Sequence, residues 1–145
     1  MLNFILLVHI AATLFITGLI WFVQIVHYPL FSSVGADGFA AYEAAHTERT
    51  TWVVGPPMLL EAGTAALLVW LRPTNFNGTL LWIGVALLVV IWLSTLLLQV
   101  PRHNLLSGGF DPTAYRALVA TNWIRTAAWS VRGVLVLWLA AQAMK

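Results

Sequence analysis

The chain has 145 residues, of which 61% are hydrophobic and only 8% are charged. This composition and a mean hydropathy of +0.88 exclude an ordinary soluble domain and indicate a protein of the lipid bilayer. The sequence contains no cysteine, which excludes disulfides, thiolate metal sites and cysteine nucleophiles. The net charge of +2 comes from scattered basic residues, so we do not expect a nucleic acid as a partner.

Four apolar segments are long enough to cross the hydrocarbon core, which takes about 20 helical residues. They are approximately Phe4–Phe31, Thr51–Leu71, Thr79–Val100 and Thr121–Ala143. Because they use most of the chain, we expect one all-α transmembrane domain over residues 1–145, built as two tandem helical hairpins. The first segment has neither a basic stretch before it nor a cleavage pattern after it, so it should stay as a helix. These features predict a multi-pass protein of a bacterial inner membrane.

The first half of the chain predicts a hairpin between two membrane faces. We name the face that holds Met1 side A and the opposite face side B. Pro29 is expected to close the first helix on side B, and after the turn at Ser32–Gly35, Asp37 is a candidate N-cap for the second helix.

The second helix is predicted to run from about Asp37 to Leu71, where Arg72-Pro73 ends it. At 1.5 Å per residue it would measure about 50 Å, so it should extend beyond the bilayer on side B. Pro56-Pro57 should bend it just before Glu61.

The second half predicts a similar hairpin. A turn at Asn75–Gly78 leads into the third helix, and Pro101 is expected to end it, leaving His103 in a loop on side B. Asp111-Pro112 combines an N-cap with a proline at the first helical position, which predicts the start of a fourth helix. If this helix runs unbroken to Ala143, it also extends beyond the bilayer.

The two halves share landmarks in the same order, which indicates a tandem repeat with a pseudo-twofold axis along the membrane normal. The matching pairs are Pro29 and Pro101, Asp37 and Asp111, Tyr42 and Tyr115, and the polar–x–x–Arg–Thr motifs that begin at His46 and Asn122. Arginines are more frequent near side B, and Arg72 and Lys145 lie near side A. This asymmetry favours side B as the cytoplasmic face, unless the arginines were placed by a functional site.

Polar residues from all four helices are expected to meet at side B, among them three of the four histidines. Neutral imidazoles from separate helices can bind copper, iron or a haem, so we predict His27, His46 and His103 as metal ligands. Gln24, Gln99 and Trp129 are the candidate cofactor-binding residues. The alternative for this cluster is a set of interfacial anchors in contact with headgroups and water.

Glu61 lies at mid-membrane depth, where an uncompensated charge is costly. Arg132 should reach a similar depth from the other half, which predicts a buried ion pair. The pair can fix the helix register, or Glu61 can act in proton transfer, and the sequence leaves both roles open. Glu61, Arg49, Arg125 and Asn122 are the candidate catalytic residues. His9, near side A, is expected to be a hydrogen-bonded packing histidine.

Two short motifs carry a family resemblance. Val100-Pro101-Arg102-His103-Asn104-x-Leu106 ends the third segment, and Asn122-Trp123-Ile124-Arg125-Thr126 opens the fourth. In these motifs the chain resembles the small four-helix membrane proteins of the anthrone oxygenase type. The resemblance implies an oxidase or oxygenase that acts on a hydrophobic phenolic or polycyclic substrate, with Asn104, Asn122 and Arg125 at the matching positions.

Three functions follow as hypotheses. The first is a membrane redox enzyme whose side-B cavity takes a lipophilic aromatic or isoprenoid substrate, with Arg49 and Arg125 stabilising an oxyanion. The second is a non-enzymatic accessory, pigment-binding or lipid-binding subunit of a larger membrane complex. The third is a proton-coupled transporter, for which four helices would need to form a homo-oligomer.

Overall fold

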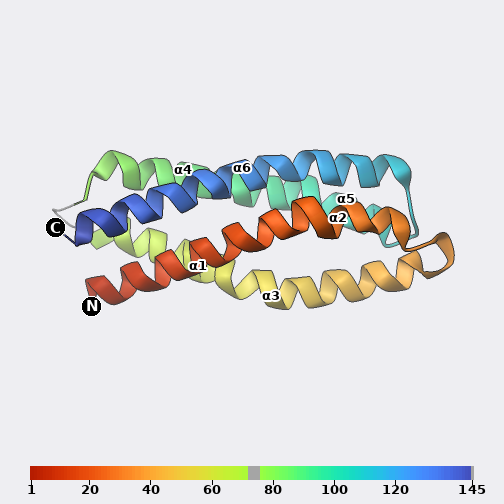
Figure 1. Cartoon of the computed structure of the whole chain (residues 1–145), viewed down its shortest axis with the longest axis horizontal. Helices are drawn as coiled ribbons and strands as arrows, with labels where there is room; N and C mark the ends of the chain where they lie inside the picture. Colours follow the sequence, from red (N-terminus) through yellow and green to blue (C-terminus); the bar gives the residue numbers. More distant parts are fainter. Residues whose placement is uncertain (72–75, 145) are drawn as a thin grey trace.

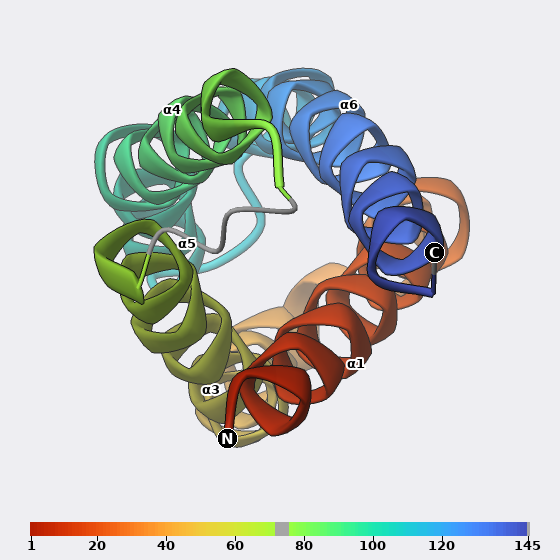
Figure 2. The same ribbon diagram turned by 90° about the vertical axis from the view of Figure 1, so that its left-hand side faces the viewer.

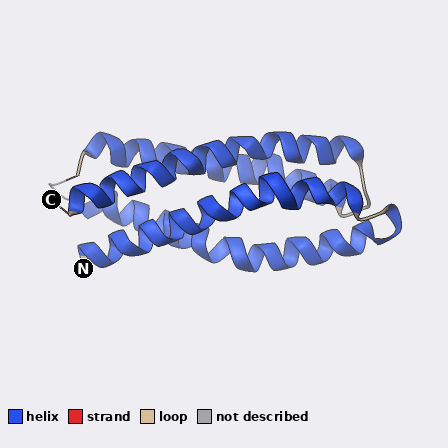
Figure 3. Cartoon of the chain, in the orientation of Figure 1, coloured by secondary structure: helices blue, strands red, loops and turns tan. Residues whose placement is uncertain are grey.

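The computed structural model describes residues 1–71 and 76–144. Four helical stretches in these ranges are long and apolar enough to cross a membrane: Leu2–Ser33, Ala36–Leu71, Gly78–Leu106 and Pro112–Ala143. Figure 3 shows that helices joined by short connections make up the described chain. The all-α fold class is therefore confirmed. The predicted end of the second helix at Arg72-Pro73, the start of the turn at Asn75, and Lys145 lie outside the described residues.

Each of the first and third stretches contains several helical elements. The first consists of α1 (Leu2–Phe22), a π-helical turn η1 (Val23–His27), α2 (Tyr28–Leu30) and a 3₁₀ turn η2 (Phe31–Ser33). The third consists of α4 (Gly78–Ser94), a second π-helical turn η3 (Thr95–Gln99) and α5 (Val100–Leu106). The second and fourth are the single long helices α3 (Ala36–Leu71) and α6 (Pro112–Ala143).

The stretches pack as a closed bundle in which each neighbours two others. α1 lies between α3 and α6, and α4 packs against α6 and α3. Figure 1 shows both chain termini at one end of the bundle, which is side A. α3 and α6 contain 36 and 32 residues, whereas about 20 residues cross the hydrocarbon. The predicted length of both helices is therefore confirmed, and their extension beyond the bilayer on side B stays a prediction.

The expectation that Pro29 and Pro101 end their helices is wrong. Pro29 lies within α2 and Pro101 within α5, and both helices continue toward side B. A π-helical turn comes directly before each proline-containing helix. The π turn interrupts the regular hydrogen-bond ladder just where proline lacks a donor, so the helix can continue past it. His103 therefore lies on α5 and not in a loop.

The π turns strengthen the tandem repeat. η1 ends at His27, two residues before Pro29, and η3 ends at Gln99, two residues before Pro101. The same irregularity at the same distance from proline in both halves is a conformational match that the sequence pattern did not contain.

The two long helices begin differently. The side chain of Asp111 accepts hydrogen bonds from the backbone N–H groups of Thr113 and Ala114, both at 2.7 Å, which confirms it as the N-cap of α6. The N-cap expectation for Asp37 is wrong, because α3 already begins at Ala36 and Asp37 lies in its first turn. Gly35, at a φ of 84°, makes the turn before α3. Figure 1 shows α3 bending in its yellow middle part, around Pro56-Pro57.

Two apolar clusters form the interior, with a polar layer between them. The cluster toward side A is built on Leu6, Leu68, Phe76 and Leu139. The larger cluster toward side B includes Ile16, Met58 and Trp129. Between them lie the buried polar residues Thr13 of α1, Glu61 of α3 and Arg132 of α6. The outer surface carries large apolar side chains, as a lipid-facing surface requires.

The capping difference predicts different effects of two matched substitutions. Asp111→Ala removes two backbone hydrogen bonds from the start of α6, so we expect it to lower stability by about 1 kcal/mol. Asp37→Ala should cost clearly less, because Asp37 does not occupy the cap position. Thermal unfolding of both variants in the same detergent measures the difference, and an equal loss would contradict the assignment.

Candidate functional site

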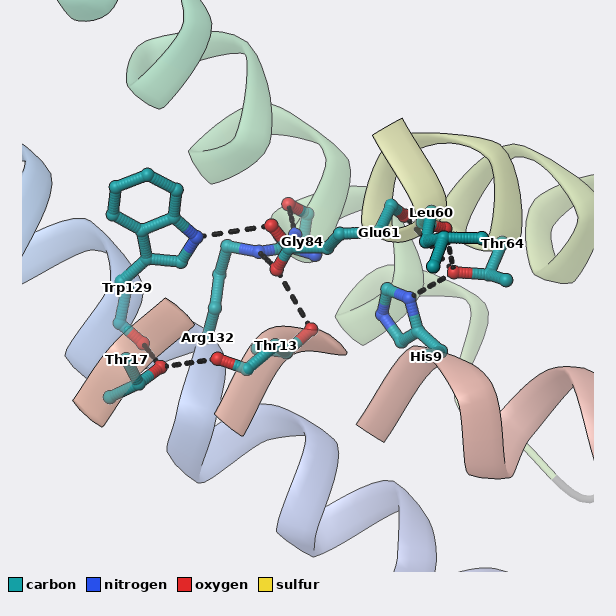
Figure 4. A network of polar contacts seen from close by, with 9 residues as sticks. All are labelled: His9, Thr13, Thr17, Leu60, Glu61, Thr64, Gly84, Trp129 and Arg132. Atoms are coloured by element: carbon teal, nitrogen blue, oxygen red, sulfur yellow. Dashed lines mark hydrogen bonds and ion pairs between the residues drawn. The ribbon is translucent and has the colours of Figure 1, made fainter. Parts of the chain in front are cut away.

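The Glu61 carboxylate is the centre of the polar layer (Figure 4). It accepts hydrogen bonds from Thr13 Oγ1 at 2.8 Å, from Trp129 Nε1 at 3.0 Å and from Arg132 Nε at 2.8 Å. The predicted ion pair with Arg132 is therefore confirmed. Glu61 is fully buried and Arg132 is 2% exposed, so the protein shields the pair from its surroundings.

Arg132 extends this network to the fourth stretch. Its Nη1 donates to the backbone oxygen of Gly84 on α4. A Cβ built at Gly84 would lie 3.6 Å from Arg132 Nη1, an ordinary van der Waals contact, so the guanidinium packs directly against this turn of α4. The network therefore joins α1, α3, α4 and α6 through Thr13, Glu61, Gly84 and Arg132. Nearer side A, His9 Nδ1 lies 2.8 Å from Thr64 Oγ1, which confirms His9 as a hydrogen-bonded packing residue.

The side-B histidines come together as the sequence predicted. His27 Nε2 lies 2.8 Å from His46 Nδ1, and the rings of His46 and His103 are 5.2 Å apart. Tyr28 adds a phenol, whose oxygen lies 3.0 Å from His103 Nε2. Phe31, which is fully buried, packs edge-on against His27 and His46 and holds the cluster in place.

This arrangement does not fit a metal centre. His27 and His46 direct nitrogens at each other, and Thr50 Oγ1 also lies 3.1 Å from His46 Nδ1. Both nitrogens of His103 are occupied by Tyr28 and Glu43. Within residues 1–71 and 76–144, no three histidine, aspartate or glutamate side chains could hold a metal ion. The predicted copper, iron or haem ligation by these histidines is therefore unsupported.

Glu43 is the functional candidate that the sequence analysis missed. Its side chain is fully buried, and its Oε1 lies 2.5 Å from His103 Nδ1. Glu43 and His46 are three residues apart, so they share one face of α3. That Glu–x–x–His spacing was the available signal. The partner is on α5, and only packing of α3 against α5 brings the two side chains together.

A cavity of about 340 Å³ lies beside this cluster, within the size range of small-molecule sites. Ile16, Leu19, Ile20, Val54 and Met58 contribute to its apolar walls. The polar lining groups are Tyr28, His46, Thr47, Thr50, Thr51, Thr95, Gln99, His103, Asn104 and Arg125, and Trp129 also lines the cavity. Thr51, Val100 and Asn104 are exposed, so the cavity opens between α3 and the α5 region.

The predicted site residues divide into two groups. His46, Gln99, His103, Arg125 and Trp129 line the cavity, as does Asn104. Gln24, His27, Asn122 and Glu61 are not among the lining residues, and Arg49 is exposed on the outer surface of α3.

Gln24 and Asn122 form hydrogen bonds behind the cavity lining. Asn122 Nδ2 donates to Gln24 Oε1 at 2.9 Å, and Gln24 Nε2 donates to the backbone oxygen of Val119 at 3.2 Å. Asn122 Oδ1 in turn lies 3.4 Å from Arg125 Nη1. These residues position Arg125 without reaching the cavity themselves.

Trp129 connects the cavity to the polar layer. Its ring lines the cavity, and its indole N–H donates to Glu61. Arg125 lies over the same ring, 5.2 Å from its centroid. Glu61, predicted as a catalytic residue, therefore contacts the cavity lining through Trp129 and does not line the cavity itself.

Comparison of the chain with protein-family models, with curated proteins and with solved structures gives no match. The class that the structure defines is a four-helix bundle with four candidate membrane spans and a polar-lined cavity at one end.

The buried ion pair predicts a strong coupling between two substitutions. Glu61→Gln leaves the Arg132 guanidinium without its counter-charge, and Arg132→Gln does the same to Glu61, so each should cost about 3–5 kcal/mol of stability. The double variant should lose less than the sum, because neither charge is then left alone. Thermal unfolding in detergent tests this, with exposed Glu48→Gln as the control. Strictly additive losses would contradict the assignment.

Proposed function

We propose that the protein is a multi-pass membrane oxidoreductase of the bacterial inner membrane, which takes a lipophilic aromatic or isoprenoid substrate into the side-B cavity. One observation carries this proposal: a hydrogen-bonded chain from Glu43 through His103 to Tyr28 ends at the cavity. A carboxylate behind an imidazole that faces a cavity is one arrangement that supports general acid–base catalysis.

The hydrogen bonds between Glu43, His103 and Tyr28 set one direction for proton transfer. An ionised Glu43 accepts from His103 Nδ1–H, which leaves Nε2 with the lone pair that accepts the Tyr28 O–H. The buried carboxylate also stabilises the imidazolium that forms when His103 gains a proton. In our proposal the substrate passes its proton to the Tyr28 oxygen as the phenol proton moves to His103.

The negative charge left on the substrate lies in the same cavity as Arg125. A lipophilic carbanion or phenolate is electron-rich, and molecular oxygen is the oxidant in our proposal. For a CH₂ group between aromatic rings, CH₂ and O₂ become C=O and H₂O, so the electrons that leave carbon are those that reduce oxygen. The reaction therefore needs no further reductant, and no step passes through a metal. The resemblance to anthrone oxygenases supports this reaction class.

A non-catalytic lipid- or pigment-binding subunit is the second candidate. The apolar walls of the cavity and its opening between α3 and the α5 region favour a binding subunit as much as they favour an enzyme, since binding needs no proton transfer. The two candidates differ at Glu43 and His103. In an enzyme, substitution of either residue should abolish turnover and preserve ligand binding. A binding protein has no turnover to lose, so the same substitutions can change only ligand binding.

The proton chain predicts the loss of oxygen-dependent turnover on substitution. With anthrone as the probe, we expect His103→Gln to lower the protein-dependent rate by about 10²–10⁴-fold, and Glu43→Gln to lower it without weakening anthrone binding. Oxygen uptake by vesicles containing the protein, corrected for protein-free vesicles, measures the rate.

Glu48→Gln is the matched control for these variants, because Glu48 is an exposed glutamate on the same helix. It should retain full activity. A wild-type protein that binds anthrone but does not raise oxygen uptake would favour the binding protein over the enzyme.

A further inference from the structure

Arg125 has no carboxylate partner in the described part of the chain. Its side chain lines the cavity and the residue is 6% exposed. Its Nε has no hydrogen-bond partner, and its Nη1 makes one long contact, 3.4 Å from Asn122 Oδ1. The Tyr28 side chain lies within hydrogen-bonding reach of the guanidinium, and it is also an uncharged group. A guanidinium carries five donors, and the neutral groups around this one leave its charge without a counter-charge.

The buried carboxylates nearby are already occupied. Glu43 contacts His103, and Glu61 contacts Arg132, and these are the ion pairs found within residues 1–71 and 76–144. Arg125 is thus a buried cation at bilayer depth that neither carboxylate contacts directly. Such a charge is costly unless something neutralises it, which makes an ionisable group inside a membrane bundle a marker of a binding site.

The surroundings of Arg125 suit an anion attached to an apolar body. The guanidinium is a planar fork that matches the oxygens of a carboxylate. Trp129 lies against it and continues into the apolar wall formed by Ile16, Ile20 and Met58. The charged and apolar surfaces therefore meet inside one cavity, and a lipophile whose head lies at Arg125 can extend its body along that wall.

We propose that the cavity selects the anionic form of its ligand: an apolar body ending in a planar oxyanion, which Arg125 binds in place of the missing counter-charge. This inference rests on the proposed function, because it names the charge of the molecule that the same cavity takes. It goes further in one respect. The preference for an anion is a property of the resting cavity and needs no chemical step.

Two probes of the same size and different charge test the proposal. 1-Pyrenebutyrate is an anion at neutral pH, and 1-pyrenebutanol is its uncharged counterpart. Binding is followed by energy transfer from tryptophan to pyrene, since Trp129 lines the cavity. The protein is used in discs of uncharged phospholipid, and transfer in protein-containing discs is compared between variants to correct for partition into lipid.

We expect the wild-type protein to bind pyrenebutyrate about tenfold or more tightly than pyrenebutanol, as a charge-assisted hydrogen bond would provide. Arg125→Gln should remove this preference by weakening the butyrate alone. Arg116→Gln should keep it, because Arg116 is an exposed arginine on the same helix and is not among the lining residues. If Arg125→Gln does not fold, Arg125→Lys replaces it and should retain a reduced preference.

Equal binding of the two probes by the wild-type protein would overturn the proposal, and so would a preference that survives Arg125→Gln. Either result leaves the lipophilic cavity of the proposed enzyme intact. Binding of neither probe would overturn the cavity itself as a ligand site. A clear preference for pyrenebutyrate without anthrone-dependent oxygen uptake would support the inference while contradicting the proposed reaction.

Discussion

The ion pair between Glu61 and Arg132 is the interaction on which the rest of the bundle depends. Apolar side chains alone do not set how far one helix slides along another in a bilayer, because lipid solvates them as well as protein does. A buried carboxylate and guanidinium tolerate one register, in which each finds the other. Through Thr13 and Gly84 this register extends to the remaining helices. Separate apolar clusters can then pack on either side of the polar layer.

The polar layer also sets the floor of the cavity. Trp129 donates a hydrogen bond to Glu61 on one side and lies against Arg125 on the other, so this one side chain links the ion pair to the cavity. The charged groups on the two sides of Trp129 differ in whether they have a partner of opposite charge. Glu61 and Arg132 neutralise each other within the protein, whereas Arg125 faces the cavity without a carboxylate partner in the described chain. A structural ion pair and the proposed binding site therefore lie next to each other, separated by an indole ring.

The repeated hairpin explains why the site lies at side B. In both halves a π-helical turn precedes a proline, and the widened backbone reorients the residues around it. Tyr28 follows η1 directly, and Gln99 closes η3, and both line the cavity. The irregular turns thus direct polar groups inward at the end where the long helices α3 and α6 begin.

Composition and spacing alone determined the class, the spans, the cap at Asp111, the meeting of the histidines and the Glu61–Arg132 pair, because each depends on hydropathy or on depth along a helix. The tertiary structure alone decided what these groups do. Continuation of the helices past Pro29 and Pro101 depends on the π turns, which sequence spacing does not reveal. The Glu43–His103 contact joins two helices 60 residues apart in the chain, and the exposure of Arg49 depends on the rotation of α3. Depth follows from counting residues, whereas direction and partner follow from helix rotation and packing.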